Sequence, residues 1–214
     1  MTSLDHHVHR WIPATQPDAP TLLLLHGTGG DERDLLQLGG MLYPGAALLS
    51  PRGNVVEHGA ARFFRRLAEG VFDVEDLHRR TKELTEWLQA ASARYGVLPQ
   101  RTFAVGFSNG ANIAASILLS HPSALAGAVL FRAMVPFEPV ASPELAGRPV
   151  LLSEGDVDPI IPPPMGERLA SILRDAGADV ELVWQRAGHQ LTNADVESAQ
   201  RWLAVHAAAG QGAR

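Results

Sequence analysis

The 214-residue sequence contains no cysteine, which excludes disulfide scaffolds, zinc sites built on thiolates and cysteine nucleophiles. It also has no apolar stretch of the roughly 20 residues that a membrane-spanning helix needs. Its first residues, MTSLDHHVHRW, lack the apolar core of a secretory signal. We therefore expect a cytoplasmic protein without integral membrane association.

Basic residues are too few to outweigh the acidic ones. Lys and Arg number 18 and Asp and Glu number 23, which gives a formal net charge of −5. This balance gives no electrostatic reason to expect nucleic acid or an anionic membrane as a partner. Hydrophobic residues make up 46% and charged residues 19%, a mixture typical of a folded globular chain.

Strand-like and helix-like segments alternate along the chain, with no repeat and no linker long enough to divide it. The pattern predicts a single α/β domain over residues 1–214, with a mainly parallel sheet flanked by helices and a frayed tail at about 208–214. We expect strands at residues 5–12, 21–25, 46–50, 102–105, 125–131, 150–154 and 180–185, and helices at residues 34–42, 74–95, 109–121, 166–176 and 193–209.

Residues 55–72 are the least regular part of the sequence. Three phenylalanines (Phe63, Phe64 and Phe72) stand there among arginines, without clear periodicity. The segment follows the end of a predicted strand, so it forms either a pocket wall or a surface loop held to the core by its aromatic side chains.

The sequence Gly106-Phe107-Ser108-Asn109-Gly110 connects a short apolar run to a helix-forming segment. A strand that turns into a helix over so few residues must bend sharply and hold its central residue in a strained conformation. The glycines let the strand and helix backbones approach each other. Ser108 would then stand at a helix N-terminus, where free N–H groups favour an oxyanion, and is a candidate nucleophile.

Polar residues follow four of the predicted strands, at the sheet edge where parallel α/β sheets bind ligands. They are the Gly-rich loop that begins at His26, then Ser108, then Asp158 with Asp156 close by, and finally His189. Of the nine histidines, His189 is preferred because it lies in a Gly-His loop between the last strand and the last helix. The order Gly-rich loop, Ser, Asp, His is the one expected of the α/β-hydrolase arrangement.

The motifs HGTGGDE, GFSNG, GDVDPIIP and GHQLT resemble the bacterial phospholipase/carboxylesterase branch of the α/β hydrolases. SPRGN, FFRRLAEGVFD and FRAMVP are further similar to small esterase-like proteins often associated with the degradation of hydroquinones and aromatic compounds. The resemblance extends from about Thr21 to Leu203. It implies an α/β-hydrolase fold without a large lid domain, and suggests a homodimer.

The resemblance also implies catalytic roles. Ser108 would attack the acyl carbonyl, and His189 would take its proton and return it to the leaving group. Asp158 matches the family pattern, in which an Asp is followed three residues later by Ile or Val and then by Pro, so it is the expected partner of the histidine. Asp156 would then be a turn former.

The oxyanion hole needs two backbone donors. The resemblance places them at Thr28, in the Gly-rich loop, and at Asn109, directly after the nucleophile. His26, which precedes that loop, is expected to support the turn rather than to react.

Five further residues are candidates for binding substrate. Arg52 and Arg132 stand at strand ends, and they either bind an anionic part of the substrate or form salt bridges with nearby carboxylates. Phe64, Phe72 and Met134 are candidates for the wall of an acyl or aryl pocket.

The remaining expectations concern cofactors and function. The cluster His6, His7 and His9 fits no established metal-site spacing, and we expect neither a metal nor an organic cofactor. The leading hypothesis is a serine hydrolase that cleaves small to medium carboxylic esters through an acyl-enzyme, with a small-molecule ester as its partner. The alternatives are a lysophospholipase or acyl-thioesterase, and a ligand-binding protein with little turnover on a hydrolase fold.

Overall fold

The computed structural model of the chain describes residues 3–68, 70–141 and 143–209. The strands of the central sheet are β1 (His9–Ile12), β2 (Thr21–Leu25), β3 (Ala47–Pro51), β8 (Thr102–Phe107), β9 (Gly127–Phe131), β10 (Pro149–Gly155) and β11 (Asp179–Gln185). The helices are α1 (Leu36–Leu42), α2 (Val74–Tyr95), α3 (Asn109–Ser120), α4 (Pro163–Asp175) and α5 (Asn193–Ala209), with short 3₁₀ turns at Leu4–His6 and Pro99–Arg101.

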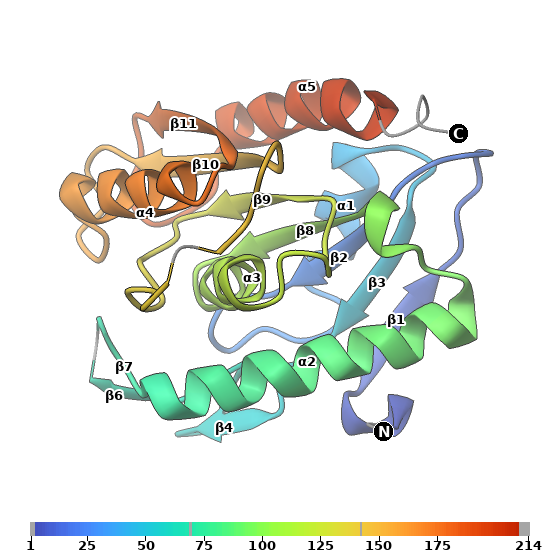
Figure 1. The fold of residues 1–214 in the computed structure, drawn as a ribbon, viewed down its shortest axis with the longest axis horizontal. Coiled ribbons are helices and arrows are strands. Elements are labelled where there is room, and N and C mark those ends of the chain that lie inside the picture. Colours follow the sequence, from blue (N-terminus) through green and yellow to red (C-terminus); the bar gives the residue numbers. More distant parts are fainter. Residues whose placement is uncertain (1–2, 69, 142, 210–214) are drawn as a thin grey trace.

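The seven strands lie in the order β1-β3-β2-β8-β9-β10-β11 (Figure 1). β1 runs antiparallel to β3, whereas every other neighbouring pair in this sheet is parallel. The prediction of a mainly parallel sheet flanked by helices is thus confirmed. None of the helices in the described part of the chain is both long and apolar enough to cross a bilayer.

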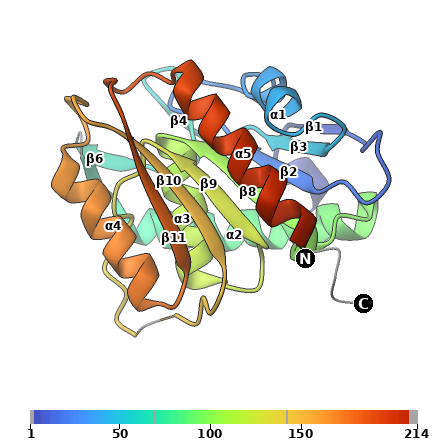
Figure 2. The same cartoon turned by 90° about the horizontal axis from the view of Figure 1, so that it is seen from above.

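Side chains of the central strands alternate between two hydrophobic clusters on opposite faces of the sheet. Leu23 and Leu25 of β2 belong to the cluster that packs against α2, α3 and α4. Leu22 and Leu24 belong to the cluster that packs against α1 and α5 (Figure 2). The apolar run at residues 21–25 is therefore buried on both faces, as a central parallel strand requires.

Most element bounds agree with the predicted ones to within two or three residues. The predicted helix at 166–176 begins earlier, at Pro163. Proline suits the first turn of a helix because the N–H groups there have no partner within the helix and because its fixed φ is close to the helical value. The predicted frayed tail, about 208–214, lies almost entirely outside the described residues, and α5 is described as far as Ala209.

Residues 55–72 contain two β-hairpins that the sequence did not predict. β4 (Val55–Glu57) pairs with β5 (Ala60–Arg62), and β6 (Arg66–Ala68) pairs with β7 (Val71–Phe72), both antiparallel. Gly59 and Gly70 have φ of 83° and 73° in the two turns, a region that glycine adopts without strain. Strands of two or three residues are too short to show a period of two, which explains why the segment looked irregular.

Candidate active site

Ser108 occupies the sharp turn between β8 and α3, with φ 53° and ψ −115°, a strained conformation for a residue with a side chain. The turn depends on its glycines. A Cβ atom on Gly110 would lie 1.9 Å from the carbonyl oxygen of Leu25, and one on Gly106 would lie 2.6 Å from the backbone of Ala111. A side chain at Gly110 would thus clash with β2, and a side chain at Gly106 would clash with the first turn of α3.

Ser108, His189 and Asp158 form a chain of two hydrogen bonds. His189 Nε2 lies 2.9 Å from Ser108 Oγ, and His189 Nδ1 lies 2.7 Å from Asp158 Oδ2. Because an ionised carboxylate can only accept, Nδ1 carries the hydrogen of a neutral imidazole. Nε2 is then the acceptor for the serine hydroxyl.

Asp158, rather than Asp156, contacts the histidine. The other carboxylate oxygen of Asp158 accepts hydrogen bonds from the backbone N–H groups of Ile160 (2.8 Å) and Ile161 (3.2 Å), which fix its orientation. Asp156 accepts instead from the N–H of Ala187 at 3.2 Å, which joins its loop to the one that carries His189. Within the described residues, Asp156 makes no hydrogen bond to His189.

Arg132 is buried behind the site and does not line the pocket, so the hypothesis that it binds substrate is not supported. Its guanidinium forms a two-pronged ion pair with Asp195, with both N–O distances 2.8 Å. It also donates to the carbonyl oxygens of Gly188 (3.0 Å) and Gln190 (2.9 Å), the residues on either side of His189. Of the two alternatives for Arg132, the structure shows the salt bridge. The guanidinium, fixed by Asp195, in turn positions the backbone on both sides of His189.

Arg52 also forms a salt bridge and does not line the pocket. Its Nε lies 2.7 Å from a carboxylate oxygen of the buried Glu32, and it is absent from the pocket lining. A position at a strand end could not separate the two alternatives, because the choice depends on a partner some distance away in the sequence.

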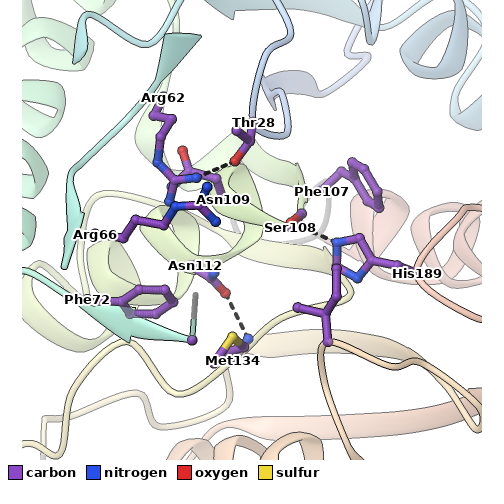
Figure 3. Close-up of a pocket in the computed structure, with 12 residues that line it drawn as sticks. Thr28, Arg62, Arg66, Phe72, Phe107, Ser108, Asn109, Asn112, Met134 and His189 are labelled. Carbon is purple, nitrogen blue, oxygen red and sulfur yellow. Dashed lines mark hydrogen bonds between the residues drawn. The ribbon is translucent and has the colours of Figure 1, made fainter. Parts of the chain in front are cut away.

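A pocket of about 230 Å³ opens beside Ser108 and His189 (Figure 3). Two of the predicted wall residues, Phe72 and Met134, line it. Phe64 does not: it is fully buried, and its ring packs edge-on against that of Phe72 at 5.0 Å between centroids. The lining residues are Thr28, Arg62, Arg66, Gly70, Phe72, Phe107, Ser108, Asn109, Asn112, Met134, Ile160 and His189.

Sequence reasoning missed Arg62, Arg66 and Asn112 as parts of the pocket. The two arginines come from β5 and β6, within the segment whose structure was left open between a pocket wall and a surface loop. The structure supports the pocket-wall alternative for that segment. The signal was the run of arginines among phenylalanines, but the sequence could not show which arginine faces the pocket.

Both residues predicted to supply the oxyanion hole, Thr28 and Asn109, line the pocket with Ser108. Asn109 is the first residue of α3, so its N–H has no acceptor within the helix. Within the described part of the chain, the backbone N–H of Thr28 makes no hydrogen bond either. Two free backbone donors therefore stand at the same pocket as the serine.

His26 supports the Gly-rich loop, as predicted. Its Nε2 accepts a hydrogen bond from the N–H of Gly53 (2.9 Å), and its Nδ1 donates to the carbonyl of Gly27 (2.7 Å). Its ring packs against Phe63 at 4.7 Å between centroids. Burial lowers the pKa of His26, which keeps the ring neutral.

The N-terminal histidines bond to protein groups. His7 Nδ1 lies 2.8 Å from the carbonyl oxygen of Arg52, and His9 lies between the carbonyl of His7 and the hydroxyl of Tyr95. No group of three or more His, Cys, Asp or Glu residues in the described ranges could hold a metal ion.

Glu154, near the end of β10, is a fully buried carboxyl group close to the site. One oxygen accepts a hydrogen bond from the N–H of Ala133 at 2.9 Å, and the other has no partner among the described residues. Burial raises the pKa of Glu154 to about 8. The group is therefore protonated at neutral pH.

Comparison with known proteins assigns the fold and the class of activity. The model of the phospholipase/carboxylesterase family matches residues 7–207. MhqD, a hydrolase by name, from Bacillus subtilis (strain 168), is 48% identical over 181 residues, which are 85% of this chain and 90% of MhqD.

Two solved carboxylesterase structures share the fold. The Bacillus cereus carboxylesterase superposes with a TM-score of 0.91 at 46% identity, with 94% of each chain covered. The Mesorhizobium loti carboxylesterase gives a TM-score of 0.84 at 29% identity, with 89% of this chain and 90% of that one covered. The chain belongs to the phospholipase/carboxylesterase family of α/β hydrolases, and it is an ester hydrolase.

Proposed function

We propose that the protein is a serine hydrolase that cleaves carboxylic esters of small to medium size through an acyl-enzyme, with Ser108, His189 and Asp158 as its catalytic triad. The observation that carries the proposal is the chain of two hydrogen bonds, 2.9 Å and 2.7 Å long, that joins the three side chains. The strained serine at a helix N-terminus, next to two free backbone donors, is the arrangement that acyl transfer needs.

The first half of the reaction forms the acyl-enzyme. Ser108 Oγ attacks the ester carbonyl carbon while its proton passes to His189 Nε2, and Asp158 stabilises the resulting imidazolium through Nδ1. The carbonyl oxygen becomes an oxyanion, which accepts hydrogen bonds from the N–H groups of Thr28 and Asn109. The intermediate collapses as the C–O bond to the alcohol breaks, and the alcohol oxygen takes the proton from Nε2.

The second half releases the acid. A water molecule gives a proton to His189 Nε2 and attacks the acyl carbonyl carbon, which forms a second oxyanion at the same donors. The bond to Ser108 Oγ then breaks, and the serine regains the proton from Nε2. The free carboxylic acid leaves the enzyme in its starting state.

The size of the pocket supports the proposed substrate range. A volume of about 230 Å³ lies below the roughly 300 to 1,000 Å³ typical of ligand sites in proteins, and it suits a short acyl group better than a long lipid chain. Arg62 and Arg66 also form part of its wall, and their charged groups are unfavourable neighbours for a long apolar chain.

Hydrolysis of p-nitrophenyl acetate by the wild-type protein and by Ser108→Ala tests the proposal. We expect the variant to lose on the order of 10³-fold or more of kcat/KM, because the nucleophile is gone. Ser123→Ala is the control, since Ser123 is exposed and lies outside the pocket. Equal rates for the wild type and Ser108→Ala would overturn the triad.

A further inference from the structure

Two asparagines in the pocket wall, Asn109 and Asn112, already use their side-chain oxygens as acceptors within the protein. The side-chain oxygen of Asn109 accepts from the N–H of Phe63, and that of Asn112 accepts from the N–H of Met134, both at 2.8 Å. Because a backbone N–H needs an oxygen acceptor, these bonds fix which atom of each amide is the nitrogen. The side-chain nitrogen of Asn109 is buried without an acceptor among the described residues. The nitrogen of Asn112 makes no hydrogen bond in the same ranges, so the amide of Asn112 has a donor left for a ligand.

Arg62 adds a buried positive charge to this wall. Its guanidinium donates to the hydroxyl of Thr28 and, at 3.2 Å, to the carbonyl of Phe64. Its Nη2 atom makes no hydrogen bond within the described ranges. Burial lowers the pKa of Arg62, and although Glu57 opposes this change, the neighbouring charge of Arg66 adds to it. The two guanidinium groups are thus close enough to repel each other.

A single carboxylate serves both arginines. An oxygen of Glu57 lies 3.4 Å from Nε of Arg62 and 3.5 Å from Nε of Arg66. None of the described residues that line the pocket carries a carboxylate. The wall that Arg62 and Arg66 form therefore carries one more positive charge than negative charge, whereas the carboxylate of Asp158 is bonded to His189.

We propose that the pocket binds the carboxylate of a substrate whose acyl part ends in a free acid, so that the substrate is a monoester of a short dicarboxylic acid. The carboxylate would accept hydrogen bonds from Arg62 and Arg66, which supply the planar donor pairs that carboxylates prefer. The excess of one charge matches a carboxylate better than a doubly charged phosphate. This inference rests on the proposed function, because it names the substrate of that same site.

The arrangement of the site places the charge on the acyl side. His189 must give its proton to the leaving-group oxygen, so the alcohol part lies against His189. Arg62 and Arg66 project into the pocket on the other side of Ser108 (Figure 3). The acyl group, which extends away from the histidine, is therefore the part that reaches the two arginines.

The test compares monoethyl glutarate with its neutral analogue, in which a carboxamide replaces the free carboxylate. We expect the wild type to prefer the carboxylate by roughly tenfold or more in kcat/KM, from the charge-assisted hydrogen bonds. Arg66→Gln should lower kcat/KM for monoethyl glutarate by roughly 10- to 100-fold, and should lower the ratio of kcat/KM for monoethyl glutarate to that for the carboxamide by roughly tenfold or more. Arg66 is partly exposed, so its replacement should leave the fold intact.

Arg65→Gln is the matched control. Arg65 precedes Arg66 in the chain, pairs with Asp73 at 2.8 Å and lies outside the pocket, so this variant should behave like the wild type. A second pair of substrates carries the charge in the alcohol part: the acetyl ester of glycolate and its amide. We expect little preference within that pair, and a strong preference for its charged member would overturn the assignment to the acyl side.

The outcomes separate this inference from the proposed function. If the wild type cleaves both ethyl esters equally well, the carboxylate site is wrong while the esterase stands. Calorimetric titration of glutarate into Ser108→Ala reports on the site without turnover. We expect binding there and its loss in the Ser108→Ala, Arg66→Gln double variant. No binding at millimolar glutarate would overturn the site even if no ester were cleaved.

Discussion

Replacing the buried Glu154 by glutamine should make the protein more stable at alkaline pH. Glutamine has nearly the shape of a protonated glutamate and can keep the hydrogen bond from the N–H of Ala133. Unlike glutamate, it cannot ionise. The substitution therefore removes a charge that the wild type must bury, or unfold to avoid, once the pH is high enough to take the proton away.

The sign and size follow from the pKa. Burial raises the pKa of Glu154 from 4.5 to about 8 in the folded protein. Because the folded state then holds a proton that the unfolded state loses, the stabilisation is fully present below pH 4.5 and is lost as the pH rises through about 8. A shift from 4.5 to about 8 corresponds to about 5 kcal/mol, an upper value because relaxation and entering water reduce the penalty.

The measurement is urea unfolding, followed by circular dichroism, at about pH 5 and about pH 9. We expect the stability of Glu154→Gln relative to the wild type to increase by about 3 to 4 kcal/mol between these two pH values. Glu181→Gln, an exposed position on the neighbouring strand β11, is the control and should follow the wild type. A constant difference between Glu154→Gln and the wild type at both pH values would refute a buried, protonated Glu154.

Three further predictions follow from the site and the sheet. Asp158→Asn should lower kcat on p-nitrophenyl acetate by roughly 10³- to 10⁴-fold, and Asp156→Asn by less than about tenfold, because only the first contacts the histidine; the reverse ranking would contradict the assignment of the acid. Asp195→Ala should cost about 3 to 5 kcal/mol in urea unfolding, because it leaves a buried guanidinium unpaired; a loss under about 1 kcal/mol would contradict this. Gly110→Ala should give no folded protein by circular dichroism, because the added Cβ would clash with the backbone of Leu25. Gly40→Ala, where a Cβ meets nothing within 4 Å, is the control and should fold normally. A stable Gly110→Ala would show that the turn can relax.

The parts of the fold that the sequence predicted well are those with strong local patterns. The apolar run of β2, buried on both faces, has no other plausible place than the centre of a parallel sheet. The contact of Ser108 with His189 could be expected because the motif and the order of the loops constrain both residues. The same is true of Asp158, although its choice over Asp156 depended on a family pattern rather than on spacing.

The choices that the sequence left open depend on pairings that no local pattern records. Arg132 at the end of β9 could equally face the pocket or the interior, and its partner Asp195 lies 63 positions away in the sequence. Arg52 and Glu32 pose the same problem over 20 positions. Arg62 and Arg66 were missed as pocket residues because the strands that carry them are three residues long.

The two hairpins between β3 and α2 have an evolutionary consequence. The residues that would break the ester bond follow strands of the central sheet, whereas Arg62, Arg66 and Phe72 belong to two small separate sheets. A mutation of Arg66 or Phe72 can therefore change which compounds are accepted without moving the nucleophile, unlike one at the buried Phe63, whose N–H bonds to Asn109. Related enzymes could thus acquire different substrates through changes at these two positions alone, and a library randomised at Arg66 and Phe72 would sample new specificities while leaving the reactive centre intact.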